Sequence, residues 1–174
     1  MRDGSIACSL LRRDAWEAVG GFPDLRAAED GIFLRRLAQA GLRTATAPEA
    51  RLQWRLPPTL IGTFRRLRRY SRINVLAGEE DQWHHGVARQ WAVAAPFAIA
   101  GLRWRPLLAV PALGFAARVG QSVLRRRDGR SLVTVLHPVR LAGVGAVLLT
   151  CDLATFVGWV DALRDRRAGR AVQG

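Results

Sequence analysis

The order of apolar and polar positions separates a mixed first half of the chain from an apolar second half. Residues 5–11 form a short apolar run without alternation, which is typical of a buried strand. Residues 50–56 alternate apolar side chains with Arg or Gln before two prolines, so they predict a second strand. Apolar residues at helical spacing predict a helix over about 29–40 and a long helix over about 59–78, with Thr59 as its N-cap. The first half therefore predicts a helix-rich α/β arrangement.

A helix of little more than one turn is predicted between the first strand and the helix at 29–40. Asp14 is its expected N-cap, because Glu17 follows three residues later as in a capping box. Gly20 and Gly21 end it. The glycines also allow the backbone of the following loop to approach a ligand closely.

The second half predicts helices that associate with a membrane. Residues 91–117 are mostly apolar, but Arg103 and Arg105 split them into two runs that are each too short to span a bilayer. Residues 141–160 are long enough, and they contain Asp152, whose charge must face protein or water at that depth. Basic residues flank this stretch on both sides, which favours a pair of crossings or helices lying in the interface. A soluble helical bundle is the alternative.

Charge and cysteine content narrow the class of protein. The 174 residues carry a formal net charge of +13, and every basic residue is Arg. Residues 91–174 are both more apolar and more basic than the first half, which favours a membrane surface over nucleic acid. Cys8 and Cys151 match no metal or redox spacing, and the N-terminus has no apolar signal core, so a reducing compartment is expected.

Two adjacent acids, Glu29 and Asp30, begin the helix at 29–40. Acids in a first helical turn are common, because they interact favourably with free N–H groups and with the helix dipole. Asp30, however, lies three residues before Phe33 and four before Leu34, so it starts the stripe expected to face inward, which Leu37 and Ala38 continue. A partly desolvated carboxylate behind a glycine loop is suited to accept a proton from an alcohol.

The helix at 59–78 carries five arginines within eight residues, listed here: Arg65, Arg66, Arg68, Arg69 and Arg72. Charge runs are usually solvated faces, but the opposite side of this helix is apolar and is expected to dock. Guanidinium groups on a docked helix can gather phosphate oxygens. Tyr70 is the single aromatic residue among these arginines, and one ring offers little surface for base stacking, so nucleic acid is not the expected partner. His84 and His85 match no helical metal-ligand spacing and are expected in a polar linker.

These motifs taken together resemble the later part of a family 2 glycosyltransferase of the GT-A fold. The resemblance covers about residues 5–76 and is carried by "SLLRRDAWEAVGGFPDLRAAEDGIFLRRLAQAGLRTATAPEARLQW". It implies that Asp30 is the general base on the acceptor hydroxyl, with inversion at the sugar carbon. It implies that Glu29 assists acceptor binding and that Gly20 and Gly21 belong to the acceptor loop. Membrane-associated helices after the catalytic domain are common in the family.

The resemblance also implies a donor site, of which only part is present. Arg66, Arg69 and Tyr70 weakly resemble the Q-x-x-R-W element that holds the donor diphosphate, with Arg in place of Gln and Tyr in place of Trp. Such enzymes bind Mg²⁺ or Mn²⁺ through an Asp-x-Asp motif, and no Asp-x-Asp occurs in this sequence. No metal ligands are therefore expected among these residues, and the metal belongs to the intact enzyme.

The sequence thus predicts a partial GT-A (Rossmann-like) domain without its nucleotide-binding half, followed by apolar helices. The expected divisions are an acceptor-side part over 1–78, a polar linker over 79–90 and a membrane-associated helical region over 91–174. The expected function is transfer of a sugar from a nucleotide-sugar to an acceptor hydroxyl at the cytoplasmic face of a membrane. A truncated chain without activity of its own is expected. The alternative is a non-catalytic basic protein that binds a membrane surface or a partner.

Overall fold

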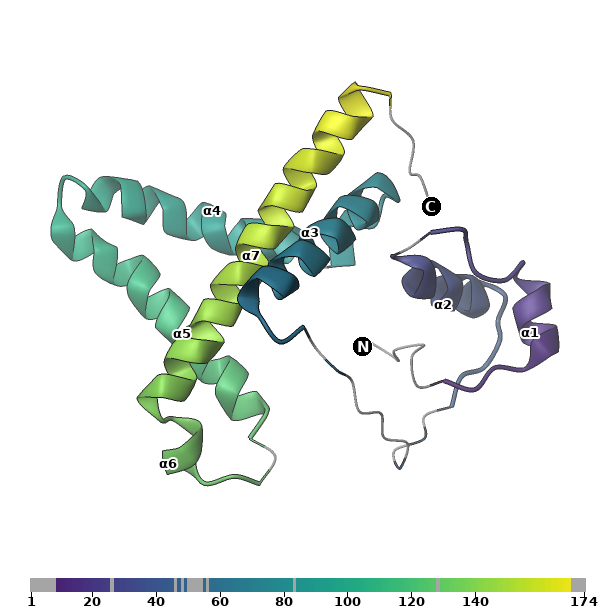
Figure 1. Ribbon diagram of the computed structural model, residues 1–174, viewed down its shortest axis with the longest axis horizontal. Coiled ribbons are helices and arrows are strands. Elements are labelled where there is room, and N and C mark those ends of the chain that lie inside the picture. The colour runs from purple at the N-terminus through teal and green to yellow at the C-terminus, as the bar shows by residue number, and fades with distance from the viewer. Residues whose placement is uncertain are drawn as a thin grey trace.

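The fold is helical throughout the part of the chain that the computed structural model describes, and no strand occurs there. The described residues are 9–25, 27–45, 47, 49, 55, 57–82, 84–127 and 129–169. Their helices, in chain order (Figure 1), are α1 (Arg13–Ala18), α2 (Glu29–Gln39), α3 (Leu60–Leu76), η2 (Glu80–Gln82), α4 (His84–Gly101), η3 (Arg105–Leu108), α5 (Ala109–Arg125), α6 (Leu132–Val135) and α7 (Pro138–Arg167).

The helices of the first half lie where the sequence predicts them, with one wrong cap. The Thr59 side chain accepts a hydrogen bond from Gly62 N at 3.1 Å, which confirms it as the N-cap of α3. Asp14 does not cap α1, because the extended residue before the helix is Arg12. Asp14 lies within the first turn and accepts hydrogen bonds from the Arg12 side chain instead.

The two predicted strands are not tested by the described residues. Residues 9–11 have no regular structure, and the rest of the run 5–11 lies outside the described part. Of the second strand, 50–54 and 56 also lie outside it. The Rossmann-like sheet therefore stays a prediction, and what the chain shows is a helix-rich structure.

Helices α3 and α7 form the main packing interface, where they cross closely (Figure 1). Gly158 makes the close approach possible, because a Cβ atom there would lie 2.3 Å from the Arg68 carbonyl oxygen and 2.7 Å from Ser71 Cβ. Ser71 is fully buried and its Oγ donates to the Thr155 carbonyl oxygen at 2.7 Å. Small residues and a helix-to-helix hydrogen bond thus hold α3 against α7.

Helices α4 and α5 form a hairpin that opens towards α7 (Figure 1). The hairpin turns at η3, where a Cβ on buried Gly101 would meet the Leu108 side chain at 2.5 Å. Helix α4 begins at His84, so the later residues of the predicted linker over 79–90 are helical, and the division itself stays a prediction. His84, the first residue of α4, packs against α3 and α7.

Helices α5 and α7 meet around a small apolar core and a buried ion pair. Val119, Val123 and Val135 form the centre of the core. Asp152 of α7 is 2% exposed and accepts hydrogen bonds from Arg118 of α5 at 2.8 Å and from Trp91 of α4 at 3.0 Å. The acid in the apolar stretch therefore faces protein, which is the condition that its position imposes.

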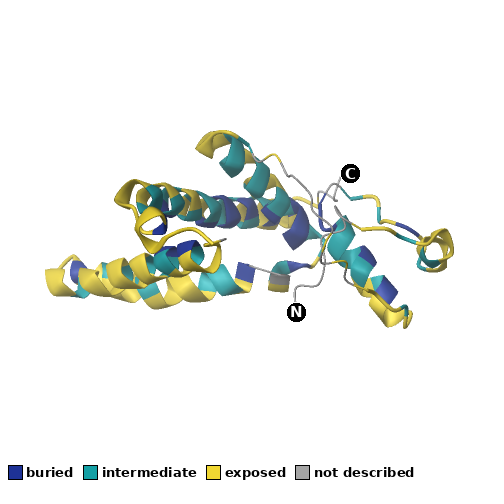
Figure 2. Ribbon diagram, turned by 90° about the horizontal axis from the view of Figure 1, so that it is seen from below, coloured by how far each residue is buried: buried dark blue, intermediate teal, exposed yellow. Residues whose placement is uncertain are grey.

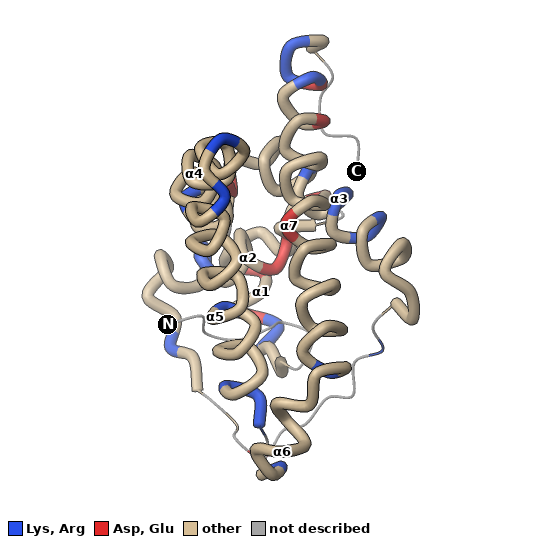
Figure 3. The backbone as a smooth tube through the Cα atoms, turned by 90° about the vertical axis from the view of Figure 1, so that its left-hand side faces the viewer, with Lys and Arg blue, Asp and Glu red and all other residues tan. Residues whose placement is uncertain are grey.

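Two segments, Arg105–Arg125 and Pro138–Arg167, are long and apolar enough to cross a membrane. Only 11% and 28% of their apolar windows are buried inside the molecule, whereas the core helix of a soluble protein is mostly buried. Much of α4, α5 and α7 is exposed (Figure 2). Charged residues are sparse along α5 and the middle of α7 and gather towards their ends (Figure 3). Length, exposure and charge together give support for membrane association.

Candidate functional site

The Gly20-Gly21 turn has a conformation and a contact that exclude other residues. Both glycines lie in the left-handed region, with φ of 73° and 67°. Gly21 N donates to the Trp16 carbonyl oxygen at 2.9 Å, which ends α1. A Cβ on Gly21 would lie 2.6 Å from Trp16 Cζ2, so the indole ring packs directly on the glycine. The pair therefore fixes the direction in which the loop leaves α1.

The loop after the glycines returns to α2 through aromatic packing. Phe22 and Phe33 have ring centroids 4.4 Å apart, and Phe33 is fully buried. The loop then enters α2 through Ala28, which has a φ of 70° and is the only described residue other than Gly with positive φ. A left-handed conformation costs an alanine roughly 1 kcal/mol, and strain of this kind gathers at functional sites. The strained residue directly precedes the two acids.

Glu29 and Asp30 form the first turn of α2, and both are half-buried. Asp30 Oδ1 accepts a hydrogen bond from Gly31 N at 2.9 Å. Glu29 Oε2 is buried and has no hydrogen-bond partner in the described part of the chain. The side chain of Glu29 thus offers a desolvated acceptor beside Asp30.

The inward stripe of α2 is narrower than its sequence pattern predicts. Phe33 and Leu37 are buried, whereas Leu34 is half-buried and Ala38 is exposed. Ala38 is exposed because few elements in the described part cover this end of α2. The half-buried position of Asp30 agrees with the expected placement at the start of the stripe.

An ion pair connects α2 to the end of α3. Arg35 donates to both carboxylate oxygens of Glu79, with Nη1 to Oε2 at 2.8 Å, and Glu79 is 6% exposed. The bond to Glu79 raises the pKa of Arg35 above its ordinary value. The sequence analysis assigned Glu79 to a linker, and no sequence signal identifies Arg35, 44 positions away, as its partner. The pair ties the helix that carries Asp30 to the helix that carries the arginines.

Arg66, Arg69 and Tyr70 lie together on α3, because residues three or four apart share one face of a helix. Arg66 Nε donates to the Tyr70 hydroxyl at 3.1 Å, and its guanidinium carbon lies 5.3 Å from the ring centroid. Arg69 lies 5.9 Å from the same centroid and is exposed. Tyr70 therefore positions two guanidinium groups through a hydrogen bond and cation–π contacts.

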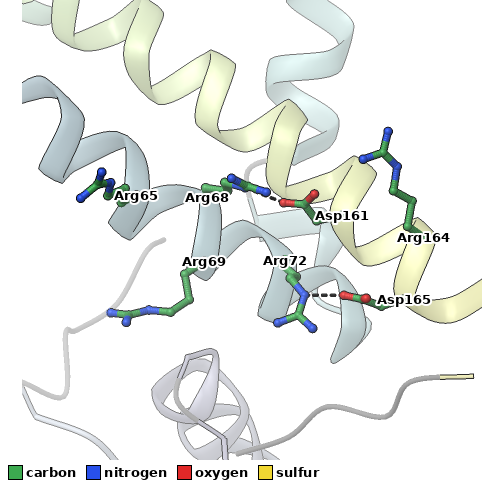
Figure 4. Close-up of a pocket in the computed structure, with 7 residues that line it drawn as sticks. All are labelled: Arg65, Arg68, Arg69, Arg72, Asp161, Arg164 and Asp165. Carbon is green, nitrogen blue, oxygen red and sulfur yellow. Dashed lines mark hydrogen bonds and ion pairs between the residues drawn. The ribbon is translucent and has the colours of Figure 1, made fainter. Parts of the chain in front are cut away.

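A second face of α3 and the last turns of α7 enclose an open cavity of about 610 Å³, the arginine groove (Figure 4). Arg68 Nε donates to Asp161 at 2.6 Å, and Arg72 Nε donates to Asp165. The hydrogen bond that Arg68 donates to Asp161 raises the pKa of Arg68. Sequence reasoning missed the two aspartates, although their spacing of four residues puts them on one face of α7. The groove is lined by Arg65, Arg68, Arg69, Arg72, Asp161, Arg164 and Asp165.

His84 is part of a buried hydrogen-bond network. Ser71 Oγ donates to Thr155, so its 2.8 Å bond with His84 Nε2 requires the nitrogen to carry the proton. Burial lowers the pKa of His84, and Trp159 packs edge-on at 5.4 Å between ring centroids. Among the described residues no group of three or more His, Cys, Asp or Glu side chains could hold a metal ion.

Comparison with known proteins identifies the family. The model of the family described as "Glycosyl transferase family group 2" matches residues 5–157. No curated protein matches the chain, and no solved structure matches it either. The match covers the Gly-Gly turn, the acidic pair, the arginine helix and most of the apolar helices. The chain therefore belongs to the family 2 glycosyltransferases.

Proposed function

We propose that this chain forms the acceptor-side, membrane-attached part of an inverting glycosyltransferase. The reaction moves a sugar from a nucleotide-sugar donor to an acceptor hydroxyl. The observation that carries the proposal is the position of Glu29 and Asp30, which open α2 directly after the strained Ala28. The family match supports glycosyl transfer in general. The roles of single residues that follow are part of the proposal.

Asp30 is the proposed general base. Its Oδ1 atom is occupied by Gly31 N, so Oδ2 is the oxygen that takes the hydroxyl proton. The acceptor oxygen then forms a bond to the anomeric carbon while the bond from that carbon to the diphosphate oxygen breaks. The electron pair leaves with the diphosphate, and attack from the opposite side inverts the anomeric configuration. General-base catalysis of this kind contributes roughly 10²–10⁴-fold.

Glu29 is proposed to hold the acceptor. Its buried Oε2 atom has no hydrogen-bond partner among the described residues, and a buried carboxylate oxygen without a partner is costly. A hydroxyl group of the acceptor would satisfy it and would orient the reacting hydroxyl towards Asp30. The Gly20-Gly21 turn directs the loop that leads to Glu29, and this loop is proposed to contact the acceptor.

Arg69 and Arg66 are proposed to stabilise the leaving diphosphate. Tyr70 holds Arg66 by a hydrogen bond, so little ordering is needed when an anion binds. Guanidinium groups bind phosphate oxygens with paired hydrogen bonds and offset the negative charge that develops on the leaving group. The family implies Mg²⁺ or Mn²⁺ at the diphosphate, but the described residues offer no fitting ligand set, so no step is assigned to a metal.

Helices α5 and α7 are proposed to anchor the catalytic part at the cytoplasmic face of a membrane. Their exposed apolar surfaces and the arginines at their ends support this arrangement. Membranes from cells that express the chain should retain it after a carbonate wash. A chain found wholly in the supernatant would refute the anchor.

Glycosyl transfer is tested at the native locus. Membranes from cells with and without the gene are incubated with labelled nucleotide-sugars, and transfer to endogenous acceptors is measured. We expect deletion to remove one transfer activity and a restored gene to recover it, with a product of inverted anomeric configuration by NMR. Unchanged transfer after deletion would refute the function and favour a non-catalytic surface protein; retained configuration would refute the single displacement.

A further inference from the structure

Apart from Arg69, which is also assigned to the leaving diphosphate, the residues of the arginine groove have no role in the proposed transfer reaction. Its members on α7 follow directly after the apolar stretch 141–160, whose last residue is Val160. Helix α3 crosses α7 at Gly158, beside the end of the same stretch. Given the proposed membrane anchor, on which this inference rests, the groove lies at the level of the lipid headgroups.

The groove carries a positive charge that its own acids do not neutralise. It contains five arginines and two aspartates, which leaves an excess of three positive charges. Asp161 and Asp165 neutralise Arg68 and Arg72. Arg65 and Arg164 have no ion-pair or hydrogen-bond partner among the described residues (Figure 4). Like charges held together in this way repel one another, and an anion between them removes the repulsion.

The ion pairs leave donors available in the groove. Arg68 and Arg72 each bind their aspartate through Nε. Within the described part of the chain, the two terminal nitrogens of each guanidinium therefore remain available to a ligand. The aspartate side chains are 18% and 9% exposed, against 48% for Arg68 and 39% for Arg72. The buried acids thus fix the arginine stems, while the guanidinium edges stay open to solvent.

We infer that the arginine groove binds the phosphate headgroup of an anionic membrane lipid. A phosphodiester offers two charged oxygens to paired guanidinium N–H groups. Its acyl chains would continue along α7, where Val160 and Leu163 are 44% and 42% exposed. No aromatic side chain is among the described residues that line the groove, so they offer no stacking platform of the kind that single-stranded nucleic acid needs.

The groove and the proposed donor site share Arg69 but differ in their other residues. Arg66 and Tyr70 line no part of it, and Arg65 and Arg164 have no part in the Q-x-x-R-W resemblance. Substituting Arg65 and Arg164 therefore tests the groove without touching the residues assigned to the leaving diphosphate. Because neither makes an ion pair with a described residue, their loss should leave the fold intact.

The test compares lipid retention by two matched double variants. The purified full chain is reconstituted with equal phosphatidylglycerol and phosphatidylcholine, and the lipids it retains are counted by native mass spectrometry. We expect the Arg65→Gln, Arg164→Gln variant to lose phosphatidylglycerol at least about tenfold, with phosphatidylcholine unchanged. The control, Arg126→Gln with Arg127→Gln, removes the same charge from an exposed loop and should retain the lipid.

Three results would overturn the inference. Equal loss in both double variants would mean that the lipid responds to net charge alone. If the groove variant retained as much phosphatidylglycerol as wild type, the lipid would not be bound by the groove. Displacement of the lipid by excess inorganic pyrophosphate would make a free phosphate the ligand. Carbonate extraction of the same variants tests the anchor separately, because the anchor depends mainly on the apolar surfaces of α5 and α7, which these substitutions leave unchanged.

Discussion

Gly158 is the residue on which the packing of α3 against α7 most depends. An alanine Cβ there would lie 2.3 Å from the Arg68 carbonyl oxygen and 2.9 Å from Ser71 Oγ, whereas ordinary contacts begin at 3.4 Å. The nearest atom belongs to the backbone, so the helices must move apart by about 1 Å at the crossing. Overpacking of this kind costs roughly 1–3 kcal/mol. Weakening the bond from Ser71 to Thr155 adds about 1 kcal/mol.

Gly158→Ala should therefore destabilise the chain by roughly 2–4 kcal/mol. For a chain of this size the melting temperature should fall by roughly 5–15 °C. The measurement is thermal unfolding in detergent, followed by helical circular dichroism. Gly143→Ala is the matched control, because it lies on the same helix and a Cβ there would meet nothing within 4 Å. The control should melt at or slightly above the wild-type temperature. A Gly158→Ala chain as stable as wild type would refute the close-packed crossing.

Two further predictions concern groups that the sequence placed in a linker. Arg35→Gln removes the ion pair between Arg35 and the buried Glu79 carboxylate and should destabilise the chain by about 1–2 kcal/mol. The expected loss is small because Arg35 is half exposed, so solvent screens the pair. Arg36→Gln is the control, and equal melting temperatures for the two variants would contradict this role of Arg35. Burial lowers the pKa of His84 in the folded chain below the ordinary histidine value of 6.5. As the pH falls through that value, the unfolded chain therefore binds a proton at His84 before the folded chain does. Stability should thus decline from pH 7.5 to 5.5, by at most about 1.4 kcal/mol per pH unit. His84→Gln, whose amide can still donate to Ser71, should flatten that decline, and an unchanged slope would show that another group titrates.

Local sequence signals predicted the helices of the first half and the position of the acidic pair well. Thr59 could be identified because a cap needs only its own side chain and the next turn. Asp14 failed as a cap because the sequence does not show which residue adopts the extended conformation, and Arg12 does so two residues earlier. Asp152 was expected to face protein or water, since its cost in an apolar environment limits its position, and it faces protein.

Long-range contacts were beyond the sequence. Nothing in the order of residues shows that Glu79 pairs with Arg35, because the two are 44 positions apart. The aspartates at 161 and 165 were assigned to no site, because only the crossing of α3 and α7 brings them to the arginines. The tight contact at Gly158 was missed for the same reason. A glycine within an apolar helix is ambiguous until the neighbouring helix is known.

The most direct test of the account is the effect of Asp30→Asn on sugar transfer. The variant is made at the native locus, and transfer from labelled nucleotide-sugar is compared with wild type and with Asp24→Asn, an exposed acid in the preceding loop. The account predicts a loss of roughly 10²–10⁴-fold for Asp30→Asn, with unchanged protein level and membrane retention, and full activity for Asp24→Asn. Near-normal transfer by Asp30→Asn would contradict the assignment of Asp30 as the general base.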